Sequence, residues 1–238
     1  MRSVEALLRE IIDYAGVFPP ASLDLAEALE NYEAYQSHPH SWMLARFVLP
    51  EKDYLAGARP RRISLVVPAG AGGSRSGVEM IETKGDFEPP PGVPVFYELD
   101  WRGDFERRMR DLKRWPNAGV KLRTGGESGP PFEAIAEFVT AAARHDLPIK
   151  FTAGLHSPLP KGGMHGFLNV FAAAFMAYSG MRVENCEEFR FTDDEFHAGR
   201  HRFTAAQAES LRHRRVISFG SCSFLEPVEH LRALGWLA

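Results

Sequence analysis

Short apolar runs alternate with loops and amphipathic stretches along most of the chain, and this alternation predicts the fold. Strand-like runs lie at 45–49, 63–67, 78–82, 95–99, 120–123, 149–152, 189–192 and 216–219. Helical spacing of apolar residues follows the later runs, at 101–113, 131–144, 164–178, 194–212 and 226–234. Strands that alternate with helices indicate parallel βαβ units. Eight such strands predict an α/β protein with a (βα)8 barrel.

The first 40 residues have a different pattern. Apolar residues recur with helical spacing from Val4 to Ile12, and the Pro19–Pro20 pair ends this stretch. A second helix is predicted over 23–36. We therefore expect residues 1–40 to form a helical segment packed on the barrel, within one domain spanning 1–238. The segment from Asp13 to Pro20 is interpreted as an aromatic corner between the helices, with a contribution of Asp13 or Tyr14 to the barrel mouth as the alternative.

The barrel is expected to be irregular around its second to fourth strands. The connections at 68–77 and 83–94 are rich in glycine or proline and have no helical pattern, although parallel crossovers usually contain a helix. This quadrant has lost its outer helices, or the third strand is misassigned, or part of it is antiparallel. Our hypothesis is that the two N-terminal helices or a partner subunit, as in a homodimer, cover the bare flank.

Composition limits the classes of function. The 238 residues carry a net charge of −3, which differs from the basic footprint of a nucleic-acid-binding protein. The two cysteines are far apart, so neither a disulfide scaffold nor a CxxC metal site is indicated. No apolar run reaches the roughly 18 residues of a membrane span, and the acidic N-terminus is unlike a signal peptide. We expect a cytoplasmic protein with no nucleic-acid or membrane partner.

Charged residues stand where a barrel interior should be. Side chains alternate along a strand, so Lys121 shares a face with Arg123, and Lys150 shares a face with Thr152. Glu98 shares a face with Phe96 on the strand before them. Three cations against one or two carboxylates leave a surplus of positive charge, which suits a phosphate or carboxylate ligand. The alternative is an internal salt bridge, such as Glu98 with Lys121, that only holds the barrel together.

The segment PIKFTAG, residues 148–154, resembles the sixth-strand motif of class I aldolase barrels similar to deoxyribose-phosphate aldolase. The resemblance covers fewer than ten residues, and it implies that Lys150 forms a Schiff base with a carbonyl substrate. Neighbouring cations such as Lys121 and Arg123 would favour the neutral, nucleophilic amine. The alternatives are that Lys150 binds an anionic group, or that its role is structural.

Other candidates lie in the loops after the strands. Gly220 and Ser221 precede a predicted helix start, which is a ready site for an anion. His156 follows the sixth strand and is the best-placed histidine for acid–base catalysis. We expect no cofactor; the alternative is a divalent metal held by Glu82, Glu98 and His156.

These observations predict a barrel enzyme for a small phosphorylated or carboxylated metabolite, with lyase or aldolase-like chemistry. The predicted catalytic residues are Lys150, Glu98 and His156. The predicted substrate-binding residues are Lys121, Arg123, Thr152, Gly220 and Ser221. The rival hypotheses are a metal-dependent barrel lyase or hydrolase, and a non-catalytic metabolite-binding or structural protein whose charges form a closed network.

Overall fold

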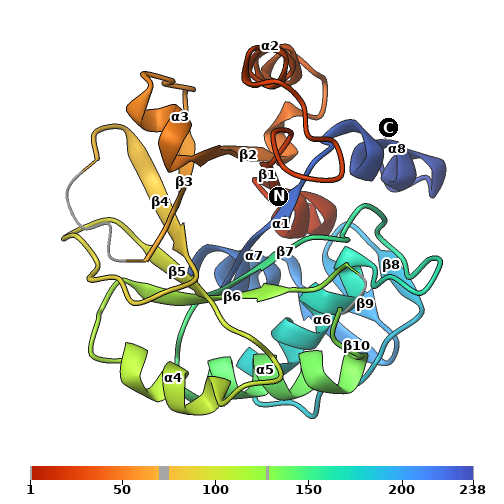
Figure 1. The fold of residues 1–238 in the computed structure, drawn as a ribbon. Coiled ribbons are helices and arrows are strands. Elements are labelled where there is room, and N and C mark those ends of the chain that lie inside the picture. Colours follow the sequence, from red (N-terminus) through yellow and green to blue (C-terminus); the bar gives the residue numbers. More distant parts are fainter. Residues whose placement is uncertain (1, 70–74, 127–128, 238) are drawn as a thin grey trace.

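Eight parallel strands close into a barrel in the computed structural model, which describes residues 2–69, 75–126 and 129–237 (Figure 1). The order around the barrel is β1-β11-β7-β6-β5-β4-β3-β2. The strands are β1 (Ile12–Tyr14), β2 (Leu44–Pro50), β3 (Ile63–Val67), β4 (Val78–Thr83), β5 (Val95–Glu98), β6 (Ala118–Arg123), β7 (Ile149–Thr152) and β11 (Val216–Ser221). The predicted fold class, an irregular (βα)8 barrel, is therefore confirmed.

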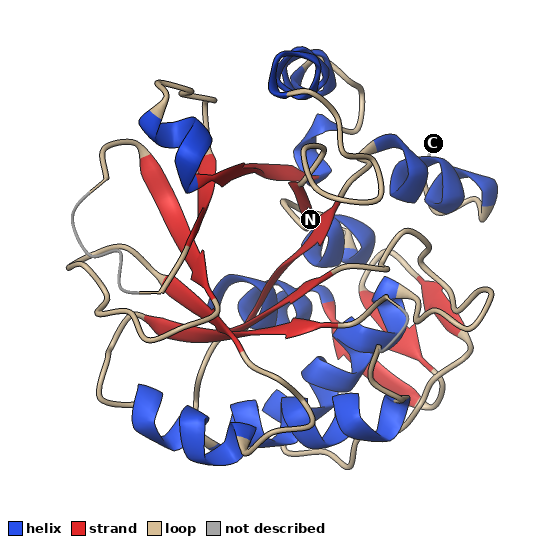
Figure 2. Ribbon diagram, in the orientation of Figure 1, coloured by secondary structure: helices blue, strands red, loops and turns tan. Residues whose placement is uncertain are grey.

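Eight α-helices and a 3-10 turn accompany the barrel within the described ranges (Figure 2). They are α1 (Ser3–Leu8), α2 (Leu25–Gln36), η1 (Ser41–Met43), α3 (Glu51–Leu55), α4 (Phe105–Leu112), α5 (Phe132–Arg144), α6 (Phe167–Tyr178), α7 (Ala205–Arg214) and α8 (Leu225–Ala233). Helices α4, α5 and α6 lie along one side of the ring of strands, at the bottom of Figure 1. The other side, around β3 and β4, is bordered mainly by loops.

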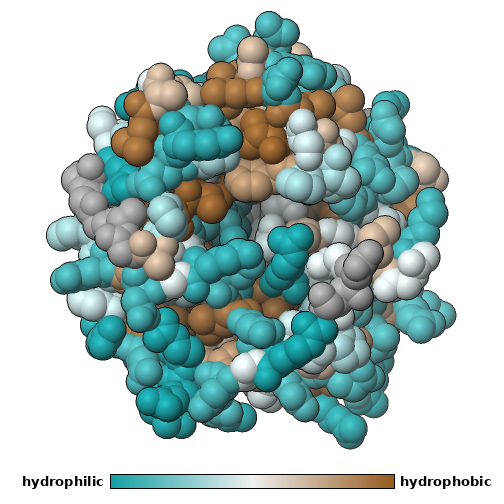
Figure 3. Space-filling model, viewed as in Figure 1, coloured by the Kyte–Doolittle hydropathy of each residue, from teal (hydrophilic) through white to brown (hydrophobic). Residues whose placement is uncertain are grey.

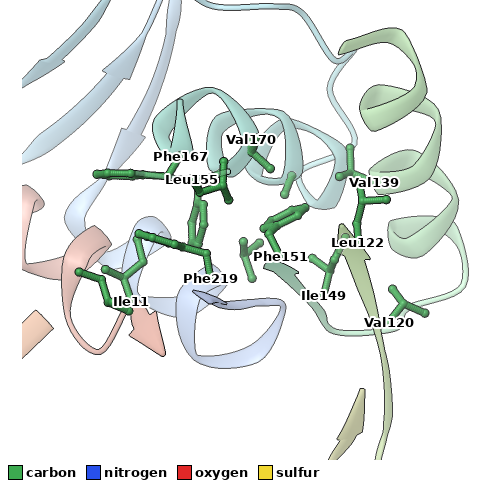
Figure 4. Packing of buried hydrophobic residues seen from close by; sticks show 14 of the residues in the cluster. Ile11, Val120, Leu122, Val139, Ile149, Phe151, Leu155, Phe167, Val170 and Phe219 are labelled. Atoms are coloured by element: carbon green, nitrogen blue, oxygen red, sulfur yellow. The ribbon is translucent and has the colours of Figure 1, made fainter. Parts of the chain in front are cut away.

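The hydrophobic core lies between the strands and these outer helices. Figure 4 shows Phe151 of β7 and Phe219 of β11 directed toward α6. The rings of Phe219 and Phe167 stack with their centroids 5.0 Å apart. Since the outward residues of the strands are apolar and buried against the helices, the alternate residues must fill the barrel itself.

The N-terminal segment differs from the prediction, because the first barrel strand lies inside it. Helix α1 ends at Leu8, Glu10 adopts a positive φ of 48°, and Ile12–Tyr14 then pairs with both β2 and β11. The sequence predicted a continuous helix because the helical spacing of apolar residues continues through Leu8, Ile11 and Ile12. A strand of three residues is too short to show the alternation that would have revealed it. The interpretation of Asp13 as part of an interhelix corner is therefore wrong.

Arg212 of α7 holds this short strand in place. The buried guanidinium donates to the carbonyl oxygens of Leu7 at 2.8 Å, Arg9 at 3.1 Å and Glu10 at 3.2 Å. It also donates to the carbonyls of Val216 and Ile217 at the start of β11. One side chain thus ties the turn before β1 to the neighbouring strand. Burial lowers the pKa of Arg212 to about 9, so the group stays charged at neutral pH.

The segment predicted as the seventh barrel strand lies outside the barrel. Phe189–Phe191 is β8, the edge of a small antiparallel sheet with β9 (Glu195–Ala198) and β10 (His201–Thr204). This sheet takes up the first half of the helix that we predicted at 194–212, and α7 begins only at Ala205. Gly199, with a φ of 55°, occupies the tight turn that joins β9 to β10.

The predicted loss of outer helices around β3 to β5 is confirmed for the described residues, although 70–74 lie outside them. The N-terminal helices do not cover this flank as hypothesised, since α1 packs mainly against α7, and α2 packs along β2. The loop after β4 covers it instead, with Phe87 buried. Tyr97 donates to the carbonyl of Phe87 at 2.5 Å, and Asn117 donates to that of Pro90 at 2.9 Å.

Candidate functional site

Charged side chains fill the barrel where apolar layers are usual. Lys121 and Lys150 are adjacent in register on β6 and β7, and both are buried, with Lys150 fully so. Gly119, lower on β6, leaves room for the ring of Phe96, because a Cβ there would lie 2.6 Å from that ring. The ring of Phe96 thus packs against Gly119, two residues before Lys121 on the same face of β6.

Glu82 of β4 is the centre of the buried network. Its Oε1 accepts from Lys150 Nζ at 2.5 Å and from the Ser64 hydroxyl at 2.6 Å. Its Oε2 accepts from Lys121 Nζ at 2.8 Å. Burial alone would raise the pKa of Glu82, but Lys121 and Lys150 outweigh it and lower the pKa well below its ordinary value. Glu82 is therefore a carboxylate at neutral pH.

Asp13 of β1 is the second buried carboxylate, and sequence reasoning missed its place. Its Oδ2 accepts from Lys150 Nζ at 2.7 Å and from the Ser218 hydroxyl at 2.5 Å. Its Oδ1 lies 3.4 Å from the Arg46 guanidinium. Burial favours the neutral acid, but Lys150 and Arg46 together lower the pKa of Asp13. The alternation of apolar and polar side chains along a strand could have revealed this position, because the apolar Ile12 and Tyr14 flank Asp13 on β1.

These contacts continue in both directions into one chain of alternating charges. Toward the carboxyl ends of the strands, Lys121 lies 2.8 Å from Glu98, and Glu98 lies 3.1 Å from Lys84. In the other direction Arg46 lies 3.2 Å from Glu79. The whole series runs Glu10, Arg62, Glu79, Arg46, Asp13, Lys150, Glu82, Lys121, Glu98 and Lys84. Each member is paired with residues of the opposite sign.

This series of ion pairs contradicts our expectation that positive charge exceeds negative charge inside the barrel. Lys121 and Lys150 each contact two carboxylates, because Asp13, Glu82 and Glu98 converge on them. Arg46, which was not among the predicted site residues, is the third cation beside these three carboxylates, because its guanidinium lies 3.4 Å from Asp13. The inner lysines are therefore neutralised, and positive charge is left over only at the mouth of the barrel.

Arg123 supplies that unpaired charge. It ends β6 with an exposed side chain, and no described residue forms an ion pair or hydrogen bond with it. A hollow of about 630 Å³ adjoins it at the carboxyl ends of β5 and β6. The lining residues are Lys84, Glu98, Leu99, Asp100, Trp101, Arg102, Arg123, Gly125 and Gly126. The mouth therefore brings a guanidinium that is unpaired among the described residues beside Glu98, the partly buried carboxylate nearest to the mouth.

Two glycine-bearing loops hold the backbone close together at this mouth. A Cβ on Gly125, after β6, would lie 2.6 Å from the Cα of Gly154, after β7. The Thr124 hydroxyl donates to the carbonyl of Ala153 at 2.7 Å, and Ala153 itself has a φ of 63°. A positive φ at a non-glycine residue costs free energy and is common where a loop serves a ligand site.

The other predicted substrate-binding residues lie on the β7 and β11 side. Thr152 pairs in register with both Arg123 and Gly220, and a Cβ on Gly220 would lie 3.0 Å from the Thr152 hydroxyl. Ser221 is buried, and its Oγ accepts from the backbone N–H of Ser223 at 3.3 Å. Thr152 thus lies beside Arg123, whereas Ser221 serves the turn into α8.

His156 lies apart from the charge chain. Its Nδ1 is 3.2 Å from Glu226 Oε2 on α8, and its carbonyl contacts His230 at 3.1 Å. Glu82 and Glu98 share Lys121 between them. The alternative metal set of Glu82, Glu98 and His156 is therefore not assembled. Across residues 2–69, 75–126 and 129–237, no three His, Cys, Asp or Glu side chains are grouped as metal ligands.

Comparison with family models, with curated proteins and with solved structures finds no significant match. The resemblance to aldolase barrels thus has no support beyond the shared architecture, a closed barrel of eight parallel strands that is common to enzymes. No helix among the described residues has the length and apolar character needed to span a bilayer.

Proposed function

We propose that the protein is an enzyme that acts on a small anionic metabolite at the mouth of its barrel. The observation that carries this proposal is the Arg123 guanidinium, which has no partner among the described residues and lines a hollow beside the Lys121–Glu98 pair. In barrel enzymes, catalytic groups stand at the carboxyl ends of the strands. A guanidinium binds a carboxylate or phosphate through two parallel hydrogen bonds, and this would orient the substrate.

The chemistry that fits these residues is aldolase-like carbon–carbon cleavage without a Schiff base. Burial lowers the pKa of Lys121, but Glu82 and Glu98 outweigh this effect and raise it, so Lys121 remains an ammonium. Glu98 would accept the hydroxyl proton of a 3-hydroxy acid. The carbon–carbon bond then breaks to give an aldehyde, and its electron pair moves onto the carboxylate as an enediolate, which Arg123 and Lys121 would stabilise together. Glu98 would return its proton to the α-carbon, so that the products are an aldehyde and a shorter carboxylate.

Lys150 takes a positioning role in this proposal. Its side chain has no access to solvent, and its amine lies between Asp13 and Glu82. A carbonyl substrate could reach this amine only if the charge chain opened. Lys150 therefore holds Glu82, which in turn holds Lys121 beneath the mouth.

The first test is binding of small anions. Arg123→Gln is expected to weaken the affinity for inorganic phosphate and 3-hydroxybutyrate by about 10- to 100-fold, the usual effect of losing charge-assisted hydrogen bonds. Isothermal titration at low ionic strength measures it. Arg107→Gln is the matched control, because Arg107 is an exposed arginine of α4 outside the hollow. Equal affinities in wild type and Arg123→Gln would contradict the proposal.

A further inference from the structure

A second hollow opens at the barrel mouth, and it differs in character from the first. It has a volume of about 520 Å³ and lies at the carboxyl ends of β2, β3 and β4. Five of its ten lining residues are apolar, namely Pro50, Leu55, Val66, Val67 and Pro68. Three more are lysines, whose hydrocarbon stems add apolar surface, whereas five of the nine residues that line the first hollow are charged.

The two hollows meet at the proposed reaction centre. Lys84 lines both of them, Glu98 lines the first, and Lys121 lines the second. The Lys121 amine and the Glu98 carboxylate are 2.8 Å apart. A molecule that lies across this pair would therefore have one end beside Arg123 and the other among apolar side chains.

Leu55 provides an independent sign that the second hollow receives an apolar group. It ends α3, and 73% of it is exposed, more than any other large hydrophobic residue in the described part of the chain. Hydrophobic surface gathers around α3 and α2 in Figure 3, while most of that face is hydrophilic. Val66 shares the inward parity of Ser64 on β3, so it faces the barrel mouth.

We infer that the substrate is an amphipathic acid, with an anionic head held by Arg123 and a short hydrocarbon group in the hollow between Leu55 and Val66. This inference rests on the proposed function and specifies the substrate class of the same site. The bond that reacts lies between the two ends, above Lys121 and Glu98. A purely polar sugar phosphate would leave the second hollow without a complementary group.

A series of straight-chain carboxylates from acetate to octanoate tests the inference. Each methylene that enters the apolar hollow should tighten binding by about fourfold, as expected from burial of one CH2 group, until the hollow is full. Leu55→Asp should flatten this dependence on chain length. Leu234→Asp is the matched control, because Leu234 is an exposed leucine after α8, outside both hollows. Alkylammonium ions of equal length measure nonspecific binding.

The outcomes separate the two proposals. If acetate binds and Arg123→Gln weakens its binding, but affinity does not change with chain length, the inference fails and the proposed function stands. A chain-length dependence that Leu55→Asp leaves intact, or that alkylammonium ions share, also overturns the inference. If no carboxylate binds at all, both proposals fail. A rise with chain length that requires Arg123 and Leu55 together supports both.

Discussion

Replacing Lys150 with methionine is expected to lower the free energy of unfolding by about 3 to 5 kcal/mol, the usual result of removing one partner of a buried ion pair. Lys150 has no solvent access, and its amine contacts Asp13 at 2.7 Å and Glu82 at 2.5 Å. Methionine fills a similar volume but leaves both carboxylates without this cation. Urea unfolding at pH 7, followed by circular dichroism, measures the loss.

Lys113→Met is the control for the loss of a lysine as such, because Lys113 is exposed at the end of α4. Its effect should stay within about 0.5 kcal/mol. A further variant, Lys150→Met with Glu82→Gln, removes one of the stranded charges and should recover part of the lost stability. A Lys150→Met protein as stable as wild type would show that Asp13 and Glu82 do not depend on Lys150 for their charge.

The stability of the wild-type protein is expected to fall steeply in acid. The pKa values of Asp13, Glu82 and Glu98 are all lowered, because burial, which raises them, is outweighed by nearby cations. A carboxyl whose pKa is lower in the folded state stabilises the fold above its unfolded pKa, and this contribution is lost as the pH falls. Urea unfolding across the range from pH 7 to pH 3 should show the loss beginning near pH 5.

In alkaline solution the dependence of stability on pH has the opposite sign. Burial lowers the pKa of Lys121, but Glu82 and Glu98 outweigh this effect and raise it, so its contribution to stability is complete below the unfolded pKa of lysine and is lost as the pH rises through the folded pKa. A plateau is therefore expected from about pH 6 to pH 10. Glu82→Gln should decline less steeply in acid than wild type, since this variant has one fewer carboxylate to protonate. Parallel profiles for the two proteins would exclude Glu82 as a source of the acid sensitivity.

Much of the barrel was predictable because its strands are short apolar runs with clear ends. The runs at 63–67 and 149–152 coincide with β3 and β7. The parity argument also placed Lys121 and Lys150 on one face of two neighbouring strands, and they lie on the inner face. Alternation along a strand is a local property, so one sequence is enough to reveal it.

The pairing of the charges was not predictable in the same way. Asp13 meets Lys150 from 137 positions away, and Arg46 meets Asp13 from 33 positions away. Parity shows which residues face inward, but the partner of each depends on strand order and register. The surplus of positive charge was inferred wrongly because Asp13 was assigned to a loop, and because Arg123 was counted with the inner lysines although it lies exposed at the end of β6.

Phe189–Phe191 was misplaced for a different reason. A short run that alternates aromatic and charged residues reads as a strand in either a parallel or an antiparallel sheet, and the prediction of a strand itself was correct. The eighth strand of the barrel is Ile12–Tyr14, and three residues are too few to show the alternation of apolar and polar side chains that reveals a strand. One short strand was missed and another was put in its place, so the predicted number of eight still agreed with the barrel.

The sharpest test is a crystal structure of the protein grown with phosphate. We expect an anion bound by the Arg123 guanidinium in the hollow at the ends of β5 and β6, above Lys121 and Glu98 joined as a pair. We also expect Lys150 to be enclosed by Asp13 and Glu82. A mouth without phosphate while Arg123 bonds to a carboxylate of its own chain would contradict the account, and so would lysines that point out of the barrel.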